Sequence, residues 1–294
     1  MDLSGISSYI VHLAIVALIF SVFAMSLNLT MGYTGMLVVC QGMFGGVAGY
    51  TMAILTTMHG FNFFLAWAFG ILAAAIVALV VGVILLRLKG DYFVLGTVGF
   101  NIIFVSIVNN WQSLTRGPFG ISGIPAPEIA GIRFSDSTMM LLLVILVFIF
   151  SYWACDYISK SNFGRALRGI REDETALSVF GYDVRKYKLV ILIISAIIVS
   201  LETPLFASYV SYIDSVTYNL DVSIVGLSIV ILGGLASNKG VVIGAVLIAL
   251  LPEFLRFVGF PDSIAAQMRV FVYGSMLVIL MIYRPQGIMG EFKL

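Results

Sequence analysis

The sequence predicts an all-α fold, a polytopic bundle of about eight to ten transmembrane helices. Only 11% of the residues are charged and 61% are apolar, whereas an ordinary soluble domain has about 25% charged residues. The apolar residues run in blocks of about 18 to 25, the length at which a helix spans a ~30 Å hydrocarbon layer. Because lipid offers no partner to backbone N–H and C=O groups, continuously apolar blocks predict helices and not barrel strands.

Nine such blocks follow one another in what we expect to be a single transmembrane domain, residues 1–294. No Lys or Arg precedes the first block, which is as long as a full span, so we expect no cleaved secretory signal. The seventh block is short and precedes LGGLASNKG, so it either crosses the membrane or forms a half-helix. The blocks are residues 8–29, 35–57, 62–86, 92–110, 138–155, 188–212, 222–235, 241–258 and 265–283.

The longest charged interruption, residues 156–188, holds seven of the sixteen basic residues. The positive-inside bias therefore predicts that this loop is cytoplasmic. Counting spans from it places the amino terminus and the Gly- and Pro-rich loop 111–137 outside. On the cytoplasmic side fall Arg87, Lys89, the loop at Asn238 and Lys239, and the carboxy terminus with Arg284 and Lys293.

Within this interruption, residues 161–192 are polar but carry apolar side chains at helical spacing, among them Leu167 and Ile170. The pattern predicts one or two short amphipathic helices on the cytoplasmic face. Two interpretations remain open: a solvated connector, or a docking element for a cytoplasmic partner. The second follows because Phe163, Leu167 and Phe180 would otherwise expose apolar surface to water.

Polar side chains are rare inside the apolar blocks: Asn28, Gln41, Asn101 and Glu202. Each costs free energy in lipid, about 2.5 to 3.5 kcal/mol for a central acid, so each should face protein or a water-filled pathway. Glu202 is either a pathway or gating residue, or else a buried hydrogen-bonding group or a carboxylate at the outer interface. Pro204, two residues on, should free a backbone carbonyl and kink its helix.

Glycines crowd the first half of the chain. Four-residue steps such as Gly42 to Gly46 and Gly45 to Gly49 favour close helix packing. The run GYTG differs, because a glycine on each side of Tyr-Thr indicates a broken helix whose free backbone groups could face a pathway. We predict that Gly32, Tyr33, Thr34 and Gly35 form this break, and LGGLASNKG contains a similar one.

Several functions are disfavoured by what is missing from the sequence. An intramembrane enzyme would need a nucleophile with a base or a metal cluster, but there is no HExxH, GxSxG or paired Asp motif. We therefore expect no catalytic residue and no metal site. A stand-alone ion-coupled carrier should have several intramembrane acids, and only Glu202 qualifies. The near-neutral net charge gives no sign of a nucleic-acid partner.

Five stretches in order along the chain resemble permeases of branched-chain amino acid ABC importers, the LivH and LivM type. Glu202 departs from that family, which usually has small apolar residues there. The stretches are LNLTMGYTGMLVVCQGMFGGVAGY at 27–50, LRLKGDYFVLGTVGF at 86–100, TRGPFGISGIP at 115–125, FGRALRGIREDETALSVFGYDVRKYKL at 163–189, and the carboxy-terminal pair ILGGLASNKGVVIGAVLIALLPEFLR and YRPQGIMG.

The resemblance implies a permease subunit in a bacterial-type inner membrane. It would pair with a second homologous permease, two cytoplasmic ATP-binding subunits and an external solute-binding protein. The chain has no GxxxxGK[ST] motif, so ATP and Mg²⁺ would bind to the partner ATPases, and no cofactor is expected here. The implied solutes are leucine, isoleucine and valine, with urea, short amides or other amino acids as alternatives.

The resemblance implies a coupling role for the cytoplasmic segment, while the intramembrane polar residues and the GYTG break supply the pathway candidates. The cytoplasmic segment would couple ATPase movement to the spans, which requires a stiff helix with an apolar anchor and charges that set its register. The coupling candidates are Phe163, Gly164, Arg165, Arg168, Glu172, Ala176 and Gly181. The pathway candidates are Asn28, Gly32, Tyr33, Thr34, Gly35, Gln41, Asn101 and Glu202.

Overall fold

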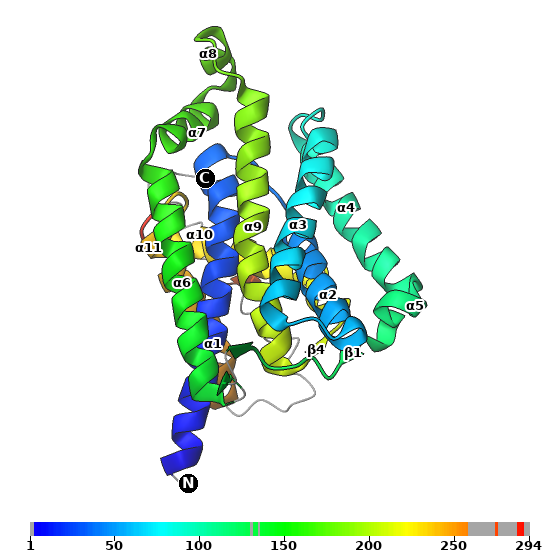
Figure 1. Ribbon diagram of the computed structural model, residues 1–294. Helices are drawn as coiled ribbons and strands as arrows, with labels where there is room; N and C mark the ends of the chain where they lie inside the picture. Colours follow the sequence, from blue (N-terminus) through cyan, green and yellow to red (C-terminus); the bar gives the residue numbers. More distant parts are fainter. Residues whose placement is uncertain (1–2, 130–131, 135, 258–273, 276–286, 291–294) are drawn as a thin grey trace.

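The computed structural model describes residues 3–129, 132–134, 136–257, 274–275 and 287–290. It confirms the all-α prediction, with long helices packed side by side in a bundle (Figure 1). Six of the described segments are long and apolar enough to cross a membrane. The long helices are α1 (Leu3–Leu27), α2 (Gln41–His59), α3 (Phe63–Leu85), α4 (Asp91–Asn110), α6 (Ser137–Lys160), α9 (Val184–Val210), α10 (Leu220–Gly233) and α11 (Asn238–Phe257).

Eight of the nine predicted blocks coincide with these helices, while block 265–283 lies outside the described residues apart from 274–275. The prediction for block 35–57 was wrong at its start. Residues 35–40 are not helical, and α2 begins only at Gln41, because Gly35 turns the chain with φ of 71°. Block 222–235 corresponds to the 14-residue α10, which with the preceding turn forms an apolar segment of 18 residues, Val216–Gly233.

The predicted loop 156–188 was too long at both ends. Residues 156–160 belong to α6 and residues 184–188 to α9, so the connection is Ser161–Asp183. Charged side chains reach water from helix ends that project beyond the apolar core, so charge alone does not end a helix. The ends are set by caps: Ser161 Oγ accepts from Gly164 N at 3.2 Å, and Asp183 Oδ1 accepts from Lys186 N at 3.3 Å.

Short elements cover the opposite end of the bundle from the Ser161–Asp183 connection (Figure 1). Within the predicted external loop 111–137, β1 (Ile121–Ser122) pairs antiparallel with β4 (Tyr212–Ile213) from the loop after α9. This pairing joins two loops about ninety residues apart and closes that end. The other short elements are α5 (Gln112–Thr115), η2 (Gly117–Phe119), β2 (Glu128–Ile129), its antiparallel partner β3 (Ile132–Arg133), and η3 (Val216–Tyr218).

Close helix packing accounts for the glycines of α2. A methyl group on Gly45 would lie 2.6 Å from Thr203 Oγ1 of α9, and one on Gly46 would lie 2.6 Å from the Phe104 ring of α4. Lipid supplies little hydrophobic drive for helices to associate, so close backbone approach provides the packing energy instead. The predicted packing role of this glycine stripe is confirmed.

Helix α9 runs through Pro204 without interruption. A proline cannot donate to the carbonyl four residues earlier, which here is that of Ser200. The indole Nε1 of Trp67 on α3 donates to this carbonyl at 3.1 Å. The predicted free carbonyl therefore exists, and it holds α3 against α9.

Candidate functional site

The Ser161–Asp183 connection folds into two short helices, α7 (Asn162–Glu172) and α8 (Glu174–Val179). Helix α7 is strongly amphipathic: Leu167 is 1% exposed and faces the bundle, as does Ile170, while Arg165 and Glu172 are exposed. The ring of Phe163 stacks on Tyr187 of α9 with centroids 5.2 Å apart. The prediction of one or two amphipathic helices is confirmed.

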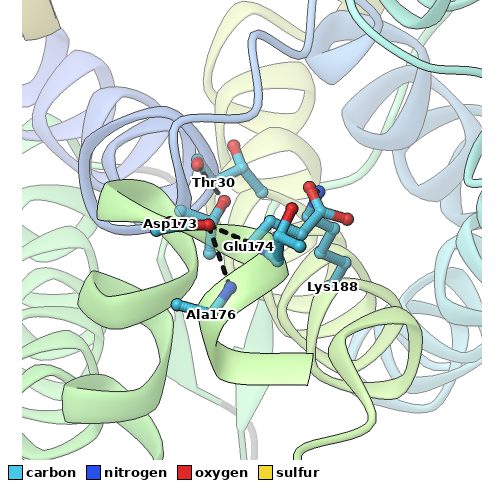
Figure 2. Close-up of polar contacts among 7 residues, drawn as sticks. Thr30, Asp173, Glu174, Ala176 and Lys188 are labelled. Atoms are coloured by element: carbon cyan, nitrogen blue, oxygen red, sulfur yellow. Dashed lines mark hydrogen bonds and ion pairs between the residues drawn. The ribbon is translucent and has the colours of Figure 1, made fainter. Parts of the chain in front are cut away.

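Polar groups cap helix α8 and join it to α9 (Figure 2). Asp173 Oδ1 accepts from the backbone N–H groups of Thr175 and Ala176 at 2.8 and 3.0 Å, which caps the helix. Lys188 Nζ on α9 lies 2.5 Å from Glu174 Oε2. The short helix is therefore held at a defined position relative to the bundle.

Two glycines of this segment are required for different reasons. Gly164 is buried against the carbonyl oxygens of Ile158 and Ser159 at the end of α6, so a Cβ there would overlap backbone. Gly181 has φ of 86°, a conformation that glycine adopts easily, although no atom lies within 4 Å of its missing Cβ. Gly164 allows close approach of α7 to α6, and Gly181 allows the turn from α8 toward α9.

The exposed apolar surface of this segment differs from the sequence prediction. The docking interpretation left Leu167 and Phe163 for a partner to cover, but Leu167 packs inside the chain and Phe163 is half buried against Tyr187. At the tip of α8, however, Val179 and Phe180 are 82% and 80% exposed. We call Val179 and Phe180 the apolar tip. In the sequence, Val179 belongs to the apolar positions at helical spacing, but it was not among the coupling candidates.

The predicted break at GYTG is present. Helix α1 continues into a π-helix, η1 (Asn28–Gly32), and the helical conformation ends before Gly35. A π-helix and a glycine with positive φ both leave backbone groups without their usual helical partners. Arg171 Nη1 of α7 donates to the carbonyl of Gly32, and the Arg168 guanidinium lies 5.4 Å from the centroid of the Tyr33 ring. Two arginines of α7 therefore contact the broken helix.

The second glycine-rich break packs against the first. Asn28 Oδ1 accepts from Ala236 N at 3.0 Å, and Asn28 Nδ2 donates to Asn238 Oδ1 at 3.2 Å. A methyl group on Gly32 would lie 2.7 Å from Ala236 N. Segments about two hundred residues apart in sequence thus form one structure, which we call the joint: residues 28–35 of the first break, residues 234–238 of the second, and Arg168 and Arg171 of α7.

Residues 287–290 complete the joint from the carboxy-terminal side. Ile288 N donates to Leu232 O at 2.9 Å, and Met289 N donates to Gly233 O at 3.0 Å. These carbonyls stand at the carboxy end of α10, where a helix has no internal donors for them. The sequence stretches LGGLASNKG and YRPQGIMG therefore contact each other.

A polar hollow of about 1040 Å³ lies beside the joint. Burial lowers the pKa of the Arg171 guanidinium, and the neighbouring Glu172 carboxylate partly offsets this effect. The loop between α3 and α4 lines this hollow together with α7 and α8, so these elements lie at the same end of the molecule. Among its lining residues are Thr34, Gly35, Arg87, Lys89, Arg171 and Lys188.

Gln41 is buried among the helices and does not line the hollow beside the joint. Its Nε2 donates to Ser26 Oγ at 2.8 Å and to Ser195 Oγ at 2.9 Å, and Ser195 Oγ donates to Ser26 O at 2.7 Å. These bonds join α1, α9 and the start of α2. Gln41 is fully buried, so in this conformation it links three helices.

The remaining two pathway candidates lie apart from the joint. Glu202 of α9 is buried and accepts a hydrogen bond from Thr203 Oγ1 at 3.0 Å. Asn101 of α4 is fully buried, and neither of its amide atoms has a partner among the described residues. Asn101 lines a second hollow, of about 510 Å³, between α4 and α10. The structure thus gathers Asn28, Gly32, Tyr33, Thr34 and Gly35 at the joint and distributes Gln41, Asn101 and Glu202 elsewhere.

Six apolar segments that are long enough to cross a membrane, one of them ending in a broken helix that Arg171 of α7 contacts, are the architecture of a multi-pass membrane protein. A family model described as the permease component of the branched-chain amino acid transport system matches residues 9–281. The chain belongs to this family, as the resemblance of its five stretches predicted.

Curated relatives cover most of the chain. LivM, the high-affinity branched-chain amino acid transport system permease protein of Escherichia coli K12, is 30% identical over 95% of this chain and 69% of its own length. LivM of Salmonella typhimurium is 29% identical over the same shares. A probable LivM of Methanocaldococcus jannaschii is 25% identical over 75% of this chain and 67% of its own length. No solved structure matches the chain.

Proposed function

We propose that this chain is the permease subunit of an ATP-driven ABC importer that carries leucine, isoleucine and valine across the inner membrane of a bacterial-type cell. Residues 1–294 form one transmembrane domain, which builds the solute pathway with a second homologous permease. Two cytoplasmic ATP-binding subunits hold ATP and Mg²⁺, and an external protein delivers the solute. The family description and the names of the relatives support this solute class.

In this proposal the end of the molecule that carries the joint, α7 and α8 is cytoplasmic. Seven basic residues within 156–188 support the orientation through the positive-inside bias. Arg87 and Lys89 support it too, because they line the same hollow as Arg171. The loop 111–137 and the amino terminus are then external, and the carboxy terminus is cytoplasmic.

The observation that carries the proposal is the contact between Arg171 of α7 and the Gly32 carbonyl. An ATPase that moves the apolar tip would displace α8 and, with it, α7, because Asp173 alone separates the two helices. Arg168 and Arg171 pass that movement to Tyr33 and Gly32. The segment that receives the force is the one whose helix is already broken.

The other coupling candidates take roles that follow from their positions. Gly164 lets α7 sit against α6, while Ala176 and Gly181 shape α8 and its turn. Arg165 and Glu172 are exposed and would set the register on the ATPase surface. Import would proceed by alternating access, with closure of the ATPases shifting the joint and opening the pathway to the other side.

Reconstitution tests the proposal directly. The chain is purified in detergent with its second permease and Walker-motif ATPases, placed in liposomes and supplied with the binding protein and labelled leucine. We expect uptake only with ATP and all components. Full uptake by the chain alone, without ATP, would instead identify an ion-coupled carrier. Calorimetry of the binding protein with leucine, valine, urea and acetamide tests the solute class.

A further inference from the structure

Several polar residues line the groove between α4 and α10, beside apolar ones. Figure 1 shows α4 at the edge of the bundle, and the groove runs along its half that is remote from α7 and α8. Its volume is about 510 Å³, which is in the range of small-molecule sites. The polar residues that line it are Asn101, Ser106, Asn109, Asn110, Asn219 and Asp221.

Asn101 is the unusual member of this set. Its side chain is 0% exposed, and both Oδ1 and Nδ2 have no partner in the part of the chain that the structure describes. A buried amide without hydrogen bonds costs free energy that an apolar side chain of similar size would avoid. Other polar residues of the groove are bonded: Asn109 accepts from Ser215 at 2.6 Å, and Asn110 donates to the Ser106 carbonyl at 2.8 Å.

The charges around the groove restrict what it can bind. Among the described residues that line the groove, Asp221 is the one that can ionise. Its Oδ2 accepts from Asn219 Nδ2 at 2.9 Å, which leaves the other carboxylate oxygen open to an ammonium group. Asp221 also lies in the first turn of α10, whose N-terminus favours a negative group. A net anionic ligand is disfavoured beside this carboxylate, whereas a zwitterion can orient its ammonium toward it.

Apolar side chains form the rest of the lining: Ile102 and Val105 of α4, and Leu220 of α10. A ligand in the groove therefore meets amides and a carboxylate on one part of its surface and branched aliphatic groups on another. An amino acid with an aliphatic side chain has the same division of polar and apolar surface. Urea or a short amide would leave the aliphatic side uncovered.

We propose that this groove is a transit subsite that receives a zwitterionic aliphatic amino acid on its way through the membrane. Asn101 Oδ1 accepts from the ammonium group, Asn101 Nδ2 donates to the carboxylate, and Asp221 offsets the ammonium charge. This assignment rests on the proposed import function and names where the solute is held. The open side of the groove, where Ile102 is exposed, faces out of the chain, and in this proposal the second permease covers it.

The test is Asn101→Leu in the complete transporter, reconstituted with the binding protein and labelled leucine. We expect the number of leucines imported per ATP hydrolysed to fall about tenfold, the effect of losing hydrogen bonds to the solute. The ATPase rate stimulated by the binding protein should stay near the wild-type rate. The thermal midpoint of the purified complex should be unchanged or higher, because the variant removes an unpartnered amide.

A matched control is Ser151→Ala on α6. Ser151 Oγ is also buried with no partner among the described residues, but it does not line the groove. Its replacement should leave the leucine-to-ATP ratio unchanged. A second variant, Asp221→Asn, keeps the shape and should also lower that ratio, since it removes the charge that faces the ammonium.

Two results with Asn101→Leu would overturn the assignment. An unchanged leucine-to-ATP ratio in Asn101→Leu excludes contact between Asn101 and the solute. A thermal midpoint that falls together with uptake identifies Asn101 as a structural residue instead. If the wild-type complex imports urea or acetamide and not leucine, the proposed solute class fails and the zwitterion subsite fails with it. If the wild-type complex imports leucine, and Asn101→Leu and Asp221→Asn both keep the wild-type leucine-to-ATP ratio, the subsite alone fails.

Discussion

The joint and the α4–α10 groove each contain a fully buried asparagine, and the two side chains differ in their hydrogen bonding. At the joint, both amide atoms of Asn28 are bonded to the second break. In the groove, both amide atoms of Asn101 have no described partner. A satisfied buried amide fixes a unique geometry, whereas an unsatisfied one costs stability and offers bonding capacity. The contrast separates a region built to hold its shape from one able to receive a ligand.

Packing around glycine repeats the contrast. A Cβ added to Gly32 at the joint would overlap backbone and side-chain atoms, while a Cβ added to Gly99 on α4 would have no atom within 4 Å. A tightly packed element transmits a displacement to its neighbours, since protein interiors have few voids to absorb it. The joint therefore suits force transmission, whereas the position of Gly99 leaves room for a larger side chain.

The largest effect is expected for Gly32→Ala. The new methyl group would overlap Asn28 Oδ1 and lie 2.7 Å from Ala236 N, so the two breaks could not remain in contact. Overpacking of this kind costs about 1 to 3 kcal/mol, and uptake should be lost. Cys40 and Cys155 are buried and free, so a thiol-reactive dye reports unfolding on heating. Gly99→Ala is the control and should keep its midpoint; equal midpoints for both would refute the packed joint.

The next effect separates the two asparagines directly. Asn28→Leu leaves Ala236 N and the Asn238 amide buried without their partner, at a cost of about 1 to 3 kcal/mol. Asn101→Leu should cost nothing by the same thermal assay. The two substitutions are chemically identical and differ only in their surroundings. A comparable loss of stability in both variants would show that the difference in hydrogen bonding does not matter.

Arg171→Gln tests the link between α7 and the break. The substitution removes the charged donor to the Gly32 carbonyl, and hydrogen bonds to charged groups contribute about 1.5 to 3 kcal/mol. We expect uptake by the reconstituted transporter to fall about tenfold or more. Lys186→Ala removes only an exposed ion pair with Asp183, so uptake by this variant should fall by less than about twofold. Similar rates in both variants would mean that Arg171 carries no force.

The smallest effect on the chain itself is expected for Phe180→Ala. Phe180 is 80% exposed, so thermal stability should not change. If the apolar tip enters an ATPase, its truncation should weaken co-purification of the ATPases about tenfold, as for a buried aromatic anchor at an interface. Phe119→Ala at the opposite end is equally exposed and should have no effect. Undiminished ATPase capture by Phe180→Ala would move the docking surface elsewhere.

Some features of the joint could be predicted from the sequence because they depend on local chemistry. The glycines around Tyr33 indicated a broken helix, and the apolar spacing at Leu167 and Ile170 indicated an amphipathic one. The pattern could not show which way these side chains face. The docking interpretation placed a partner over Leu167, yet Leu167 packs inside the chain, because amphipathic spacing specifies an apolar face and not what covers it.

The candidate pathway was less predictable. Intramembrane Asn28, Gln41, Asn101 and Glu202 look alike in the sequence, since each is a polar residue in an apolar block. Their different roles depend on partners far along the chain: Asn238 for Asn28, and Ser195 for Gln41. No local pattern contains that information.

The sequence by itself determined that lipid is the solvent of this protein, that its spans are helices, and that a basic amphipathic segment interrupts them. These follow from hydropathy, charge and period, which are properties of neighbouring residues. Only the tertiary structure decided that the two glycine-rich breaks meet, that α7 contacts them through two arginines, and that one buried asparagine is bonded while another is not. The physical reason is that burial and hydrogen bonding belong to pairs of groups, and these pairs form between residues as much as two hundred positions apart.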